Sequence, residues 1–424
     1  MPQEKSESYF PEEIKKLIEP NGLERVTSAG LTRETRIPGT DIKRDPVFRF
    51  ERGQILRAYK HMREQIRLSS AQGADQESQR AYLSEFRERA RQLEKDLDEL
   101  NKQFYSNVRQ IEVETSSVGR HVLPLVELDL RSSGGQEKAD AEGEKDERIP
   151  YFVVGGIGTN AHETAALASS LALAGNKVYV SSYPESLPQV PKDWGERVGQ
   201  NRTYALHAEV VKETIKNAGL ERVNLMGFSM GTGVVMEAAS DKNFDRIQDL
   251  VVLEPVSIED KGVVKLFYDF FWRQGAMRFL LNAEQRVKAL EQGRSQSKSL
   301  SPVFITDGQI ISHKHFDPEK LSRLNAHGEI KIMFGTESPI VDAAKATQIF
   351  SEANQLRLDR DPQNPPIHLY KVNGGDHSWP LVNAAGLAYI LAEPHESDEY
   401  VTTIDREYLE NSAAKALLSR PTTA

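Results

Sequence analysis

From residue 150 onward, apolar runs of strand length alternate with segments of helical periodicity. The runs are YFVVGG, NKVYVSSY, RVNLMGF, DLVVLEP, EIKIMFG and IHLYKV. Several are apolar at every position, which is typical of strands covered on both faces. The segments between them are NAHETAALASSLALAG, NRTYALHAEVVKETIKNAG, GTGVVMEAASD and DAAKATQIFSEANQLRL. This alternation predicts an α/β fold with a doubly wound, mostly parallel sheet.

Upstream of residue 150 the periodicity changes twice. VRQIEVETS and HVLPLVELDL alternate with period two and predict a strand pair at one sheet edge. Residues 51–104 have helical periodicity with a polar break, which predicts an antiparallel helical hairpin. Its second helix carries a seam of Leu83, Phe86, Ala90, Leu93, Leu97, Leu100 and Phe104. We favour an arm that buries this seam within the chain, and a dimerising or partner-binding coiled coil is the alternative.

The remaining segments complete the predicted organisation. Residues 1–50 are polar and dotted with proline, so we expect an extended N-terminal segment. Residues 131–148 are small and charged, which predicts a mobile surface loop. Residues 105–424 then form one α/β domain. Within it, about 70 residues separate LVVLEP from EIKIMFG, far more than the usual loop of about 2 to 6, so residues 256–326 are expected to form a helical cap or lid.

The segment NLMGFSMGTG carries the strongest chemical signal. Gly227, Ser229 and Gly231 fit G-x-S-x-G between a predicted strand and a predicted helix, which is the context that this motif requires. A sharp turn there exposes the serine hydroxyl at a helix N-terminus, where the helix dipole favours negative charge. Ser229 is therefore the candidate nucleophile.

A nucleophilic serine needs a base and a carboxylate that orients it. His377 follows the last predicted strand of the alternating region in VNGGDHSWP, at the same sheet edge as Ser229. For the acid we rank Glu337 first, Asp342 second and Glu254 third. His61, His162 and His207 are expected to be surface or capping histidines, and His313 and His315 lack a third metal ligand.

These motifs resemble the α/β-hydrolase superfamily over residues 105–395 or so. GFSMG is similar to its nucleophile elbow, GGDHSW to its histidine loop, and the order Ser229, Glu337, His377 to its order of nucleophile, acid and base. A common family form, Gly-x-x-Asp, would place the acid at Ser338, one residue after Glu337. The resemblance implies a serine esterase or lipase-like enzyme with a cap over its active site.

The stretch YFVVGGIGTNA admits two interpretations. Gly156, Gly158 and Ala161 fit the G-x-G-x-x-A loop that binds a dinucleotide pyrophosphate. A dinucleotide site also needs an acidic residue about 20 positions later, where this chain has Ser181 and Ser182, and Glu185 comes too late. We therefore predict half of an oxyanion hole. Its expected donors are the Ile157 and Met230 N–H groups, with Gly156 as the fallback for Ile157.

Composition narrows the reaction class. The chain has no cysteine, so thiolate catalysis, disulfides and cysteine zinc sites are excluded. The net charge is −9 without a dense basic block, which argues against nucleic acid as a partner. We expect a cytoplasmic protein with no membrane span, no cofactor and no metal. It would cleave a small carboxylic ester, with an apolar acyl or aryl group suggested by the aromatic insertion.

Other outcomes use the same residues. A thioesterase, an acyltransferase or a peptidase would share the triad, and a binding or scaffold protein could retain the fold without the reaction. A homodimer through the helical arm is a further expectation.

Overall fold

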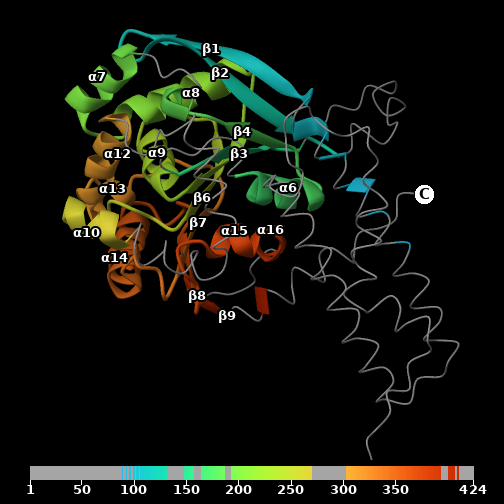
Figure 1. Ribbon diagram of the computed structural model, residues 1–424. Helices are drawn as coiled ribbons and strands as arrows, with labels where there is room; N and C mark the ends of the chain where they lie inside the picture. The colour runs from blue at the N-terminus through green and yellow to red at the C-terminus, as the bar shows by residue number, and fades with distance from the viewer. Residues whose placement is uncertain are drawn as a thin grey trace, which may run out of the picture.

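The part of the chain that the structure describes holds one nine-stranded sheet, seen in the computed structural model (Figure 1). Its order is β1-β2-β4-β3-β5-β6-β7-β8-β9. The strands are β1 Val108–Thr115, β2 Gly119–Leu128, β3 Tyr151–Val154, β4 Val178–Ser181, β5 Val223–Phe228, β6 Ile247–Leu253, β7 Ile330–Gly335, β8 Ile367–Asn373 and β9 Val401–Asp405. Strand β2 is antiparallel to β1 and β4, and all other neighbours are parallel. The predicted mostly parallel sheet is confirmed.

The described residues are 107–130, 148–156, 164–186, 192–269, 302–392 and 400–405, with scattered positions between 88 and 106 and the pair 408–409. The predicted extended segment 1–50, most of the helical hairpin and nearly all of the loop 131–148 lie outside them. The central part of the predicted cap also lies outside them.

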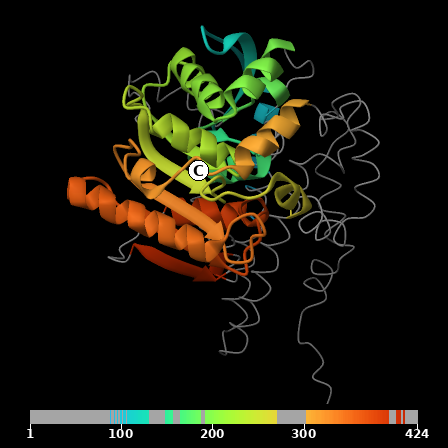
Figure 2. The same ribbon diagram turned by 90° about the vertical axis from the view of Figure 1, so that its left-hand side faces the viewer.

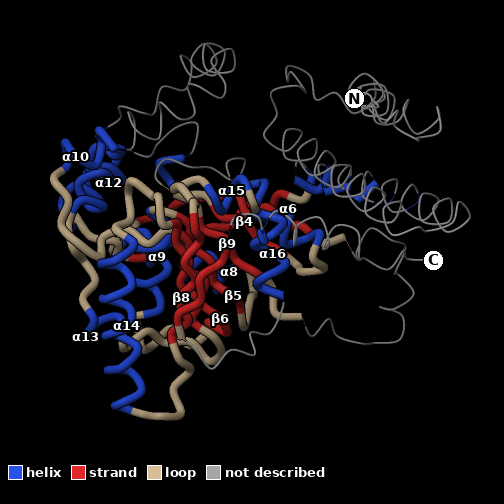
Figure 3. Tube along the Cα trace, turned by 90° about the horizontal axis from the view of Figure 1, so that it is seen from below, coloured by secondary structure: helices blue, strands red, loops and turns tan. Residues whose placement is uncertain are grey.

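Helices cover both faces of the sheet (Figures 1 and 3). One face carries α6 Ala165–Leu173 and α16 Ala384–Ala392, with the short α15 Trp379–Val382 beside them. The other carries α8 Ala205–Asn217, α9 Met230–Ala239 and α14 Ala343–Arg360. Figure 2 looks onto this second layer, with the long orange helix α14 in front of the sheet. Each layer buries its own apolar cluster against the sheet.

Burial along the strands follows the sequence pattern. Strand β7 is buried at all six positions, as its continuous apolar run predicts. In edge strand β1 only Ile111 and Val113 are buried, because alternate side chains face solvent. All eight predicted strands are confirmed, whereas β9 was not predicted, since VTTID lacks an apolar run.

The connection between β6 and β7 is described at its two ends. It holds α10 Val263–Phe267, α12 Pro302–Ser312 and α13 Pro318–Leu321. Helix α12 is tied to the sheet domain through Ser257, whose hydroxyl donates to Ile311 O at 3.0 Å and bonds the Tyr204 hydroxyl at 2.6 Å. Burial raises the pKa of Tyr204, so its hydroxyl stays neutral and is free to donate to Ser257. A cap function for this connection stays a prediction.

The described end of the N-terminal arm packs on the sheet domain. Leu100 and Phe104 are 1% and 2% exposed and belong to the buried cluster beneath α6 and α16. The Gln103 amide donates to Asp129 O and accepts from Asp129 N, both at 2.8 Å. This end of the seam is therefore buried within the chain, in line with the favoured interpretation.

Candidate active site

Ser229 occupies a sharp turn between β5 and α9. Its backbone has φ 55° and ψ −120°, a conformation that costs about 1 to 3 kcal/mol for a residue other than glycine. A Cβ at Gly227 would meet Gly231 O at 2.4 Å, and one at Gly231 would meet Val154 O at 2.4 Å. Only glycine fits at either position. The two motif glycines thus let α9 approach β5 and the end of β3 closely enough to present Ser229.

His377 reaches Ser229 from the loop after β8. Its Nε2 lies 2.9 Å from Ser229 Oγ, and its ring packs against Phe228. This loop crosses the end of β7, where a Cβ at Gly335 would meet Gly375 O at 2.1 Å. The structure therefore brings together the two residues that the sequence selected as nucleophile and base.

Glu254, ranked third from the sequence, is the carboxylate that contacts His377. It follows β6, is fully buried, and lies with Oε2 3.1 Å from His377 Nδ1. Its other oxygen accepts from Gly335 N and from the Trp379 indole N–H, both at 2.6 Å. The backbone of Glu254 has a positive φ of 61°, a second strained position at the site.

Glu337 and Asp342, the two acids ranked highest from the sequence, do not contact His377. The ranking is therefore corrected in favour of Glu254. Glu337 lies in the loop after β7 with its side chain exposed, and its N–H donates to Gly375 O at 2.9 Å. The backbone bond holds the loops together, whereas the carboxylate faces solvent. Asp342 is exposed and caps α14 by accepting from Lys345 N at 3.0 Å. Asp342 therefore stabilises the N-terminus of α14, as an N-cap aspartate usually does.

The contacts fix the tautomer of His377. A carboxylate only accepts hydrogen bonds, so Nδ1 carries a hydrogen and donates it in a hydrogen bond to Glu254 Oε2. In a neutral ring, Nε2 is then the acceptor for the Ser229 hydroxyl. The imidazole is oriented as a base toward that hydroxyl, which is the arrangement general-base activation requires.

The expected oxyanion donors are only partly within the described residues. Met230 begins α9 directly after Ser229 and is buried. Gly155 and Gly156 are buried at the end of β3, and Ile157 lies outside the described residues. The Tyr183 hydroxyl donates to Gly155 O at 3.3 Å. Burial raises the pKa of Tyr183 well above its usual range, so the phenol remains a neutral donor there.

Two features of the site were missed from the sequence. The Gly335 N–H and the Trp379 indole bind the acid, yet neither was considered. Trp379 lies two residues after His377 in HSWP. An indole N–H so close to the candidate base was the sequence signal for a donor to the carboxylate. The prediction for His207 was also wrong, because this histidine is buried rather than at the surface.

Comparison with known proteins gives likenesses of structure only. No protein-family model and no curated protein matches the chain. Carboxylesterase CesB from Bacillus subtilis matches 70% of this chain and 95% of its own, at 13% identity and a TM-score of 0.41. A meta-cleavage product hydrolase from Pseudomonas fluorescens matches 67% and 95%, at 13% identity and 0.46. A bromoperoxidase from Bacillus anthracis matches 67% and 98%, at 14% identity and 0.44.

Identities this low carry no information on the reaction. Among the described helices, none combines the length and apolar character that a membrane span requires.

Proposed function

We propose that the protein is a serine hydrolase that cleaves a carboxylic ester through an acyl-enzyme intermediate. The observation that supports this proposal is the continuous set of contacts from Ser229 through His377 to Glu254. A strained serine at a strand-to-helix turn, bonded to a histidine that a buried carboxylate orients, serves nucleophilic catalysis better than any structural purpose.

In the proposed reaction, Ser229 Oγ attacks the acyl carbon while His377 Nε2 takes its proton. Glu254 keeps the ring oriented and stabilises the imidazolium that forms. The carbonyl oxygen becomes an oxyanion, for which the Met230 N–H and an N–H of Ile157 or Gly156 are the proposed donors. His377 then gives the proton to the leaving alcohol as its bond to the acyl carbon breaks. In the second half, His377 takes a proton from a water that attacks the acyl-enzyme, and returns it to Ser229 Oγ as the carboxylic acid leaves. Loss of one oxyanion donor typically costs about 3 to 4 kcal/mol in the barrier.

Active-site labelling tests the proposal directly. We expect a fluorophosphonate probe to modify folded wild-type protein at Ser229, with intact-mass and peptide analysis locating one adduct. Ser229→Ala should show no adduct, and His377→Ala should react far more slowly because the hydroxyl loses its base. Labelling that persists in Ser229→Ala would contradict the assignment. An unlabelled wild type with native circular dichroism would instead favour a binding or scaffold role.

Substrate profiling separates the chemistries that share this triad. Matched p-nitrophenyl esters, acyl thioesters and anilides, assayed with and without an added alcohol acceptor, distinguish ester hydrolysis from thioester cleavage, peptide cleavage and acyl transfer. We expect esters to react fastest, with rates that rise with acyl length. A preference for short, polar acyl groups would contradict the apolar substrate inferred from the aromatic insertion.

A further inference from the structure

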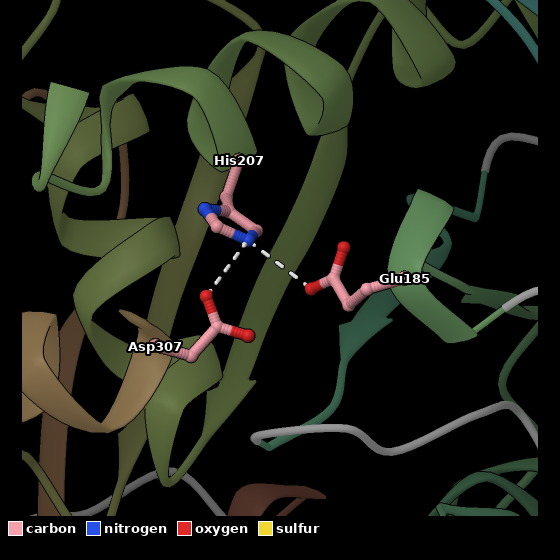
Figure 4. Close-up of side chains that lie close together, drawn as sticks. All are labelled: Glu185, His207 and Asp307. Atoms are coloured by element: carbon pink, nitrogen blue, oxygen red, sulfur yellow. Dashed lines mark hydrogen bonds and ion pairs between the residues drawn. The ribbon is translucent and has the colours of Figure 1, made fainter. Parts of the chain in front are cut away.

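A second buried cluster of ionisable side chains lies between three segments that are distant in the sequence (Figure 4). Glu185 comes from the turn η3 Pro184–Ser186 after β4, His207 from α8 and Asp307 from α12. Their side chains point toward one another, and they are 5%, 0% and 0% exposed. The proposed hydrolase reaction uses none of them, so their convergence needs a separate explanation.

The geometry of the cluster suits one small cation. His207 Nε2 lies 3.1 Å from Glu185 Oε1 and 3.7 Å from Asp307 Oδ1, and all three atoms lie within 4.8 Å of one another. Tetrahedral zinc with bonds of about 2.1 Å holds its ligand atoms roughly 3.4 Å apart. The two measured separations lie on either side of that value.

The charges of the cluster point the same way. Neither oxygen of Asp307 has a hydrogen-bond partner among the described residues. Two ionised carboxylates would place two negative charges in a buried site, which is costly unless a positive charge compensates them. A protonated His207 carries one positive charge, which compensates one of the two carboxylates. Asp307 then lies 3.7 Å from the same nitrogen, and its carboxylate has no hydrogen bond within the described part of the chain. A divalent cation compensates both.

The surroundings of Glu185 resemble a prepared ligand shell. The Trp194 indole N–H donates to Glu185 Oε2 at 2.7 Å, which leaves Oε1 directed at His207. The rings of Trp194 and Tyr183 meet the His207 ring edge-on, with centroids 5.2 and 5.3 Å away. The bond from Trp194 is of the kind that orients a metal-ligating carboxylate and raises metal affinity. His207 Nδ1 has no hydrogen-bond partner among the described residues, so packing against the two rings positions this imidazole.

We propose that Glu185, His207 and Asp307 bind one divalent transition-metal ion. Zn²⁺ is the ion to test first, because histidine nitrogen and carboxylate oxygen are both among its usual ligands. The ion joins α12 to η3 and α8, and so fastens the returning end of the β6–β7 connection to the sheet domain. Its role is structural, and it stands whether or not Ser229 is a nucleophile.

Metal uptake by the untagged full-length chain tests this site. After removal of metals with EDTA and dialysis against Zn²⁺, elemental analysis should find one ion per chain, and thermal unfolding should shift upward. Asp307→Asn should bind Zn²⁺ more than about 100-fold more weakly, because even an outer-shell partner is worth about 10- to 100-fold. Trp194→Phe, which removes such a partner, should weaken binding within that smaller range.

His121→Gln is the matched control, since His121 is also buried and also meets Trp194 edge-on. It should keep the full uptake and the full thermal shift. Failure of the wild type to take up Zn²⁺ would overturn the proposal, as would equal affinity in Asp307→Asn. If the variant does not fold, Co²⁺ added to wild type decides the matter. A visible absorption spectrum typical of tetrahedral nitrogen and oxygen ligands supports the site, and its absence at saturating Co²⁺ refutes it.

Discussion

Glu254 shows how much a single buried carboxylate can organise. Three donors converge on it, from His377, Trp379 and the backbone of Gly335. Because all three groups are donors, the side chain between them must accept hydrogen bonds at both of its polar atoms. An ionised carboxylate is the side chain that does so. Glu254, which itself follows β6, therefore joins the end of β7 to the His377 loop after β8.

Glu254→Gln tests that role against the exposed Glu337. The amide would turn an NH₂ group toward a donor and lose the charge that stabilises imidazolium, so kcat for ester hydrolysis should fall on the order of 10⁴-fold. Glu337→Gln should leave kcat unchanged, because the Glu337 side chain is exposed and only its backbone N–H bonds the His377 loop, at Gly375 O. Steady-state kinetics of both variants gives the answer. A crippled Glu337→Gln beside an active Glu254→Gln would restore the ranking made from sequence.

The backbone of Ser229 predicts a trade between stability and activity. Ser229→Gly removes the backbone strain, which is about 1 to 3 kcal/mol. Against this gain stands a loss of about 0.5 to 1 kcal/mol, because glycine is more flexible in the unfolded chain. Ser229→Ala keeps the strain, because alanine has a Cβ. Both variants should be inactive, and urea denaturation should find the glycine variant about 0.5 to 2 kcal/mol more stable than the alanine variant. Equal stabilities would mean that the turn is not strained.

At the scale of elements, the position of α9 depends on a glycine with no room for a side chain. Gly231→Ala places a methyl group 2.4 Å from Val154 O and 2.5 Å from Gly155 O, so the helix or β3 must shift. We expect a loss of at least about 1 to 3 kcal/mol in stability, with reduced activity because the same shift moves Ser229 and the proposed oxyanion loop. Denaturation curves and esterase rates measure the two effects.

Gly199→Ala is the control for this prediction. Gly199 lies in helix α7 Lys192–Asn201, with open space where its Cβ would be. Alanine there should stabilise the protein by about 0.5 to 1 kcal/mol, since it removes the cost of glycine inside a helix. If both substitutions changed stability alike, close packing at Gly231 would not be the cause.

The elements were more predictable than the contacts between them. Buried strands such as β7 reveal themselves as apolar runs, and the elbow as glycines around Ser229, because local sterics dictate both. Whether the acid follows β6 or β7 depends on how the His377 loop crosses Gly335, which is a tertiary contact without a local signal. The same limit concealed the cluster around His207, whose members come from three separate elements.

At the scale of the whole molecule, segments from outside the alternating strands and helices pack back on the sheet domain. The strand β9 adds beside β8, and the described end of the arm packs under α6 and α16. The Ser257 and Tyr204 hydroxyls tie α12 to the other side. Strand β9 is held by backbone pairing with β8, whereas the arm and α12 are held by side-chain contacts. A single substitution can therefore weaken the attachment of the arm or of α12.

Phe104 offers the test for the arm. It is 2% exposed within one chain, so Phe104→Ala should lower the free energy of unfolding by about 3 to 5 kcal/mol through lost packing. Lys102→Ala, at an exposed position two residues earlier, should stay within about 0.5 kcal/mol of wild type. Because Phe104 is already buried by its own sheet domain, sedimentation should find the same oligomeric state in both variants as in wild type. A change from dimer to monomer in Phe104→Ala without loss of stability would instead assign this end of the seam to a dimer interface.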